Sequence, residues 1–226
     1  MNILRALIIA VLLVSPATAQ IPPSPTELSA YRGLHAAAAT GNVAEIERLI
    51  ASGEKPDPLD GHQRTPLHVA IFMHQGAAAR ALLRHGAEPN ALEAQRYDIV
   101  TIAAVANDVD MLNLALEAGC KSGNITSPYD GTALIAAAHL GHAEVVRTLI
   151  AAKAPLDHIN NLGWTALIES IVLGDGGNNH IATLDALVKA GANVNLADRN
   201  GATPLRLAQR RGYSEVVKIL DAAGAK

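Results

Sequence analysis

Nine histidines and one cysteine are the residues of this 226-residue chain that could do metal or thiol chemistry. Histidine and cysteine commonly bind zinc, and a His-Glu-x-x-His segment or paired cysteines would indicate such a site. Neither spacing occurs, and Gly141 interrupts a helix between His139 and His142. We therefore expect no metal and no cofactor. A metal-dependent factor or enzyme that uses the histidine-rich surface stays open as the second interpretation.

The cysteine, Cys120, has no partner in the chain for a disulfide. It follows Gly119 at a position that Ala87 and Ala192 fill elsewhere, so a buried small residue is favoured over a reactive thiol. A Gly-x-Ser-x-Gly elbow and a pair of catalytic carboxylates are also missing. The glycine-rich stretch Gly174–Asn179 lacks the Lys-Ser/Thr of a phosphate loop. We therefore expect that the protein is not an enzyme.

A repeated helical unit must position these residues. In Thr65-Pro66-Leu67-His68-Val69-Ala70, the threonine hydroxyl can cap a helix and the proline suits its first position. Gly86 then ends a second helix, because glycine adopts the left-handed conformation easily. The intervals between successive first-helix starts are 33, 33, 34, 33 and 38 residues. These starts are Arg32, Thr65, Asp98, Thr132, Thr165 and Thr203.

The period and its motifs resemble the ankyrin-repeat family over about residues 28–226. The resemblance implies an all-α fold, an α-solenoid of about six stacked repeats, each a helix-turn-helix with a β-turn or hairpin tip. The expected repeats are 28–57, 58–91, 92–125, 126–159, 160–196 and 197–226. The motifs are Thr65-Pro66-Leu67-His68-Val69-Ala70, Gly141-His142-Ala143-Glu144-Val145-Val146, Gly191-Ala192-Asn193-Val194-Asn195 and Asp198-Arg199-Asn200-Gly201-Ala202-Thr203-Pro204-Leu205.

The repeat pattern has departures at helix ends and in loops. His74 stands where a glycine between helices is expected, and Lys153 stands where a glycine should end a helix. If Lys153 is left-handed, its side chain would lower the stability of the fold by roughly 1 kcal/mol. Five extra residues around Gly174–Asn179 are expected to lengthen the loop between the helices of the fifth repeat.

Residues 1–19 are typical of a secretory signal. Arg5 precedes the apolar run Ala6–Val14, and Ala17-Thr18-Ala19 predicts cleavage after Ala19. The run is shorter than the ~20 residues of a membrane span, although an anchored or buried helix is the alternative. We expect a periplasmic or secreted protein with no membrane span after signal removal. The prolines of residues 20–27 predict an extended spacer without a helix.

The charge of the chain argues against a nucleic-acid partner. The formal net charge is −3, and removal of Arg5 with the signal makes it −4. No basic run occurs, and an acidic balance repels phosphate. We expect a monomer that binds a protein.

The repeat frame predicts which side chains face outward, on turn tips and at the ends of first helices. Five of the six aromatic residues fall on these positions, and aromatic residues and arginine are enriched at interface anchors. They either contact a partner or pack against neighbouring tips, and both can hold at once. For the C-terminal arginines, a solvated end of the stack is the alternative. The candidate partner-binding residues are Tyr31, Arg64, Phe72, Met73, Tyr97, Tyr129, His139, Leu140, Trp164, Val172, Leu173, Arg210 and Arg211.

These observations favour a non-catalytic protein–protein interaction module that acts in the periplasm or outside the cell. Its partner would lie on a concave inner surface formed by the first helices and the turn tips. The family resemblance implies an accessory, protective or toxin-neutralising role. A purely structural spacer is a third interpretation, which the aromatic positions disfavour.

Overall fold

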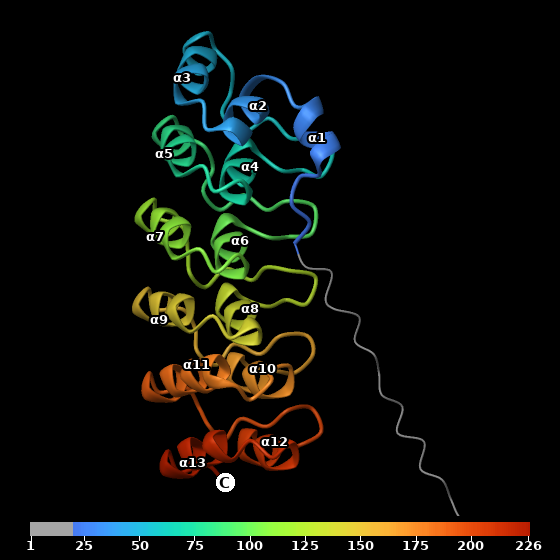
Figure 1. Ribbon diagram of the computed structural model, residues 1–226, viewed down its shortest axis with the longest axis vertical. Coiled ribbons are helices and arrows are strands. Elements are labelled where there is room, and N and C mark those ends of the chain that lie inside the picture. Colours follow the sequence, from blue (N-terminus) through green and yellow to red (C-terminus); the bar gives the residue numbers. More distant parts are fainter. Residues whose placement is uncertain (1–19) are drawn as a thin grey trace, which may run out of the picture.

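The computed structural model describes residues 20–226, and the predicted signal, residues 1–19, lies outside them. Six helix pairs form one elongated stack, with the short helix α1 beside its N-terminal end (Figure 1). Across residues 20–226 there is no β-strand, and the isolated antiparallel bridge between Thr126 and Gly131 is the only β pairing. The predicted all-α solenoid of six repeats is confirmed.

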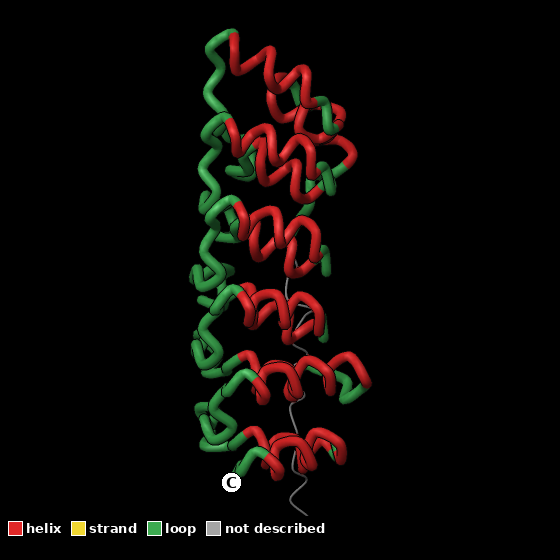
Figure 2. Tube along the Cα trace, turned by 90° about the vertical axis from the view of Figure 1, so that its left-hand side faces the viewer, coloured by secondary structure: helices red, strands yellow, loops and turns green. Residues whose placement is uncertain are grey.

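The first helix of each pair lies in one layer and the second helix in the other, and the turn loops project to one side (Figures 1 and 2). The first helices are α2 (Gly33–Thr40), α4 (Pro66–Phe72), α6 (Ile99–Val105), α8 (Ala133–Leu140), α10 (Ala166–Val172) and α12 (Pro204–Arg211). The second helices are α3 (Val43–Ala51), α5 (Gly76–Arg84), α7 (Val109–Glu117), α9 (Ala143–Ala151), α11 (Asn178–Lys189) and α13 (Ser214–Ala222); α1 spans Pro25–Ala30.

Side chains at the predicted starts cap five of the six first helices. Thr65 accepts a hydrogen bond from the backbone N–H of His68, and His68 Nδ1 accepts one from the backbone N–H of Thr65 at 3.1 Å. His68 Nε2 lies 3.1 Å from the Ala91 carbonyl oxygen, so this fully buried ring ties the helix start to the next turn. His68 therefore stabilises the turn at the start of α4. The capping residues are Thr65, Asp98, Thr132, Thr165 and Thr203.

One hydrophobic core runs the length of the stack, from Leu34 in α2 to Leu220 in α13. Each first helix packs on the first helices of its neighbours and on its own second helix; α8, for example, packs on α6, α9 and α10. A single pair could not bury its apolar face, so stability comes from the contacts between repeats.

The backbone is left-handed at both positions where another residue replaces the expected glycine. Lys153 has φ +62°, where Gly86 has φ +84° and Gly191 has φ +94° at the same place in their repeats. His74, between α4 and α5, has φ +55°. Both residues therefore hold a left-handed conformation that a side chain disfavours.

Two boundaries differ from the sequence prediction. The spacer 20–27 was expected to lack a helix, but α1 begins at Pro25. The reason is that proline is tolerated at the first helical position, and Ser24 and Glu27 form a capping box there. The insertion near Gly174 lengthens the helix as well as the loop, because α11 has 12 residues where α9 has 9.

Within residues 20–226, no helix combines the length and the apolar character that crossing a membrane requires.

Candidate functional site

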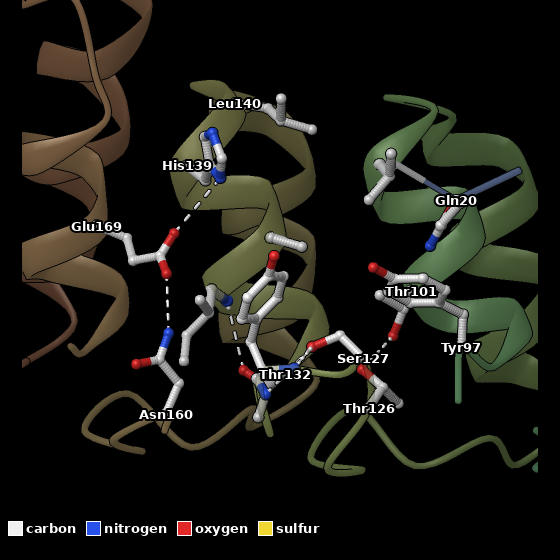
Figure 3. Close-up of a pocket in the computed structure, with 15 residues that line it drawn as sticks. Gln20, Tyr97, Thr101, Thr126, Ser127, Thr132, His139, Leu140, Asn160 and Glu169 are labelled. Atoms are coloured by element: carbon white, nitrogen blue, oxygen red, sulfur yellow. Dashed lines mark hydrogen bonds and ion pairs between the residues drawn. The ribbon is translucent and has the colours of Figure 1, made fainter. Parts of the chain in front are cut away.

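A pocket of about 260 Å³ lies between α6, α8 and α10, on the side of the stack formed by the first helices and the turn loops (Figure 3). We call this side the inner surface; it corresponds to the predicted concave surface. The pocket is lined by Gln20, Tyr97, Thr101, Val105, Thr126, Ser127, Tyr129, Gly131, Thr132, Ile135, Ala136, His139, Leu140, Asn160 and Glu169.

The loops that carry the pocket residues are joined by backbone hydrogen bonds. The N–H of Asn161 donates to the carbonyl of Tyr129 at 2.9 Å, and the N–H of Ser127 donates to the carbonyl of Arg96 at 3.0 Å. The N–H of Tyr97 donates to Glu93 Oε1 at 3.0 Å. These bonds hold Tyr97 and Tyr129 in place on neighbouring tips.

Asn160 and Glu169 form the polar end of the pocket. Asn160 Oδ1 accepts hydrogen bonds from the backbone N–H groups of Leu162 and Trp164, each at 3.0 Å. Its amide nitrogen is thereby directed at Glu169, and Nδ2 donates to Glu169 Oε1 at 2.8 Å (Figure 3). Burial raises the pKa of Glu169 to about 7, although the Asn160 hydrogen bond acts in the opposite direction.

His139, at the end of α8, faces the same carboxyl group. Its Nδ1 lies 3.5 Å from Glu169 Oε2. Burial lowers the pKa of His139, and the nearby His180 lowers it further. His180 in turn lies between the His139 carbonyl oxygen, 2.9 Å from Nε2, and Asp175 Oδ1, 2.8 Å from Nδ1. The insertion at Asp175 therefore braces the polar end of the pocket.

The N-terminal segment of the described chain also reaches the pocket. Gln20, the residue after the predicted cleavage site, is 8% exposed and lines the pocket near Tyr97 and Thr101 (Figure 3). Its Nε2 has no hydrogen-bond partner among residues 20–226. Arg64 Nη1 donates to the carbonyl of Ile21 at 3.3 Å, which ties this segment to the stack.

Comparison with known proteins gives this architecture its family. The family model for ankyrin repeats in three copies matches residues 7–93 and 100–198, which is most of the chain. The chain belongs to the ankyrin-repeat family. Ankyrin repeat domains generally mediate protein–protein interaction, and the fold is generally non-catalytic.

Three ankyrin-repeat relatives show how far the likeness extends. The ankyrin repeat protein YahD of Escherichia coli K12 is 32% identical over 190 residues, which cover 84% of this chain and 94% of that protein. An ankyrin repeat domain from Acinetobacter baumannii AYE, solved as a crystal structure, is 42% identical with a TM-score of 0.81, over 85% and 98% of the two chains. The ankyrin repeat domain of Bcl-3, of the IkappaB protein family, is 27% identical with a TM-score of 0.77, over 87% of each chain.

The ankyrin stack brings four of the candidate residues together at the pocket: Tyr97, Tyr129, His139 and Leu140. Leu140 is 41% exposed, and Tyr129 is half-buried. Tyr97 was expected to face outward, which is wrong in part. It is only 7% exposed because it packs into the hydrophobic core of the stack, although it still lines the pocket.

Arg64 was also expected to face outward, and this expectation is wrong. Its side chain is 1% exposed, with Nε donating to Asp60 Oδ2 at 2.7 Å and Nη2 paired with Glu27. Tyr31 belongs to the same cluster, since its hydroxyl donates to Asp60 at 2.7 Å. Arg64 faces inward because α1, which the sequence did not predict, brings Glu27 over it.

The other candidate partner-binding residues do not line the pocket. Arg210 and Arg211 are exposed, and Arg211 Nη2 donates a hydrogen bond to the carbonyl oxygen of Val172. The half-buried candidates outside the pocket are Tyr31, Phe72, Met73, Trp164, Val172 and Leu173.

The repeat pattern did not predict the pocket residues Glu169, Asn160, Thr101 and Gln20. A signal existed for Glu169, because it is the one charged residue four positions after a first-helix start. No repeat-level signal marks Gln20, because it precedes the first repeat.

Within residues 20–226, Cys120 and several histidines, such as His35, His68 and His142, make hydrogen bonds to backbone carbonyl groups. Over residues 20–226, no group of three or more His, Cys, Asp or Glu side chains is placed to hold a metal ion. Cys120 is buried, and its thiol donates to the Pro89 carbonyl oxygen at 3.3 Å. Burial raises the pKa of this thiol to about 12, so the prediction of a buried small residue is confirmed.

Proposed function

We propose that this ankyrin-repeat protein is an exported, non-catalytic binding module that holds a partner protein on its inner surface. The observation that carries the proposal is the pocket of about 260 Å³ shared by three successive first helices and their turn loops. A site built from three repeats depends on the stack as a whole, as expected of a repeat-protein binding surface.

The chemistry of the pocket supports a protein partner. Tyr129 and Leu140 are large side chains that remain accessible at its rim, while Tyr97 forms part of its wall. Apolar groups kept accessible around a hollow commonly mark a contact surface. The volume is slightly below the ~300–1,000 Å³ usual for small-molecule sites, which suits one inserted side chain of a larger partner.

The N-terminal sequence supports the exported location that we propose. Arg5, the apolar run Ala6–Val14 and the small residues before Gln20 support export, to the periplasm or outside the cell. There the protein would act as a monomer in an accessory, protective or toxin-neutralising role.

A capture experiment on the exported fraction tests the proposal. Wild-type protein and the double variant Tyr129→Ala/Leu140→Ala are immobilised and exposed to periplasmic and culture extracts of the native source. We expect the double variant to lose at least nine-tenths of the captured partner while keeping the far-UV helical signal of the wild type. The matched control is Leu59→Ala, at a leucine that is 62% exposed and does not line the pocket.

Two results would contradict the proposal. Equal capture by the double variant would show that the partner binds elsewhere. A purified protein from the native source that retains residues 1–19 and stays in the cytoplasmic fraction would refute export. Light scattering of the same sample checks the monomer.

A further inference from the structure

Glu169 is the feature of the pocket that the repeat architecture does not require. It lies in α10, four residues after the capping Thr165. A buried carboxyl group lowers stability unless it is well compensated, so an acid at an apolar position calls for another explanation. The residues at the same place in the other five repeats are all apolar: Ala36, Val69, Ile102, Ala136 and Leu207.

The carboxyl group of Glu169 is poorly supplied with donors. It is 5% exposed, and Asn160 Nδ2 is its one hydrogen-bond donor within residues 20–226. His139 Nδ1, at 3.5 Å, lies beyond ordinary hydrogen-bond length. A carboxylate offers about four acceptor positions, so most of them are left for a ligand.

The charged groups around α10 leave this carboxylate without a strong cation. His139 faces it from α8. The Nε2 atom of His180 in α11 contacts the backbone carbonyl oxygen of His139. Asp175 pairs with His180, and Arg211 of α12 bonds a backbone carbonyl at the end of α10. No lysine or arginine of the described chain forms an ion pair with Glu169.

The rest of the pocket is suited to an aliphatic chain. Tyr129, Ile135 and Ala136 line the same pocket as Glu169, and no lysine or arginine lines it. Long basic side chains place their stems on apolar surface and keep the charge at the tip. The charge and the shape of the pocket therefore complement one such side chain.

We propose that the pocket receives a lysine or arginine side chain of the partner protein, with its stem along Tyr129 and Ile135 and its charged head on the Glu169 carboxylate. This inference rests on the proposed function, because it names the part of the partner that enters the pocket. Pairing with Glu169 supplies the cation that the carboxylate lacks, and selects partners that carry a basic residue at the point of contact.

An NMR titration with fragments tests the pairing without the partner. The probes are n-butylammonium, which copies a lysine side chain, and 1-butanol, which has the same stem without charge. We expect butylammonium to shift the amide signals of Thr101, Ile135 and Glu169 in a saturable way, at least tenfold more tightly than butanol. Binding should also lower the pKa of the Glu169 carboxyl group, read from its carbon shift.

Two variants separate the charge from the fold. Glu169→Gln keeps the shape and the Asn160 hydrogen bond, and should weaken butylammonium binding at least tenfold while leaving butanol unchanged. Glu144→Gln is the matched control, because Glu144 is an exposed acid of α9 that pairs with Arg147, and it should bind both fragments as the wild type does. Equal binding of both fragments to the wild type, or an unchanged affinity in Glu169→Gln, would overturn the inference.

The capture experiment distinguishes this inference from the proposed function. Capture of the partner should fall at least tenfold in Glu169→Gln. If capture persists in that variant but is lost in Tyr129→Ala/Leu140→Ala, the inner surface binds a partner without a basic side chain in the pocket. If butylammonium binds at Glu169 but capture survives in Glu169→Gln, the pocket serves a small amine, and the inference is refuted.

Discussion

Asn160 Nδ2 donates a hydrogen bond to Glu169 Oε1 over 2.8 Å, from the turn loop onto the helix that follows it. The loop amide is itself held by two backbone N–H groups, so the donor arrives in a set orientation. One neutral donor does not replace the water that Glu169 loses on burial. This balance leaves a buried acid that is easily protonated.

The stability of the protein should therefore carry a pH signature of Glu169. Its pKa is 4.5 when unfolded and about 7 when folded, so the folded state binds the extra proton between these values. The contribution of Glu169 to the free energy of unfolding should fall by about 3 kcal/mol as the pH rises from 4.5 to 7. Glu169→Gln removes that loss, because its amide stays neutral at every pH.

Urea unfolding of the wild type and Glu169→Gln at pH 4, 6 and 8 measures this effect. The stability difference in favour of the variant should grow from pH 4 to pH 8 and level off above it. A difference that is independent of pH would show that Glu169 is ionised without penalty in the folded protein.

Lys153 should be replaceable with a gain in stability. Its φ of +62° is left-handed, and glycine adopts this conformation without a side-chain clash. Lys153→Gly should raise the free energy of unfolding by roughly 1 kcal/mol, or about 2–4 °C in Tm for a chain of this size. The mirror control is Gly191→Ala, where φ is +94° and an added Cβ meets no atom within 4 Å, so only the backbone strain is tested. A lower or unchanged Tm for Lys153→Gly would refute the strain.

Arg64 should be among the residues whose loss destabilises the fold most. Its side chain is 1% exposed and pairs with Asp60 and Glu27. Burial would raise the pKa of Asp60, but hydrogen bonds from Tyr31 and Arg64 outweigh burial and hold it at about 2. Arg64→Met leaves these acids without their cation, and should lower the free energy of unfolding by about 3–5 kcal/mol.

The control for Arg64→Met is Arg80→Met, at an arginine that is 56% exposed and 3.6 Å from Glu117. Exposed pairs contribute about 0–1 kcal/mol, so this variant should unfold nearly as the wild type does. The Asp60 pKa in Arg64→Met, followed by NMR, should rise well above 2. Equal stability of the two variants would mean that Arg64 is not the centre of a buried cluster.

Local rules account for what could be predicted. Thr65, Pro66 and His68 define a helix start through bonds made within four residues, and Gly86 ends a helix through its own backbone. The same rules failed at Pro25, where the prolines suggested an extended spacer although proline suits the first position of a helix.

Residue types close together in the chain were enough to predict the repeat, its helix pairs and the left-handed conformation at Gly86 and Lys153. Contacts between segments far apart in the chain turn Arg64 inward and bring Gln20, Tyr129 and Glu169 to one pocket. Glu27 lies 37 residues from Arg64, and the pocket residues come from the N-terminal segment and three repeats. Burial depends on which segments stack against each other, and that is settled by packing between repeats rather than by any single motif.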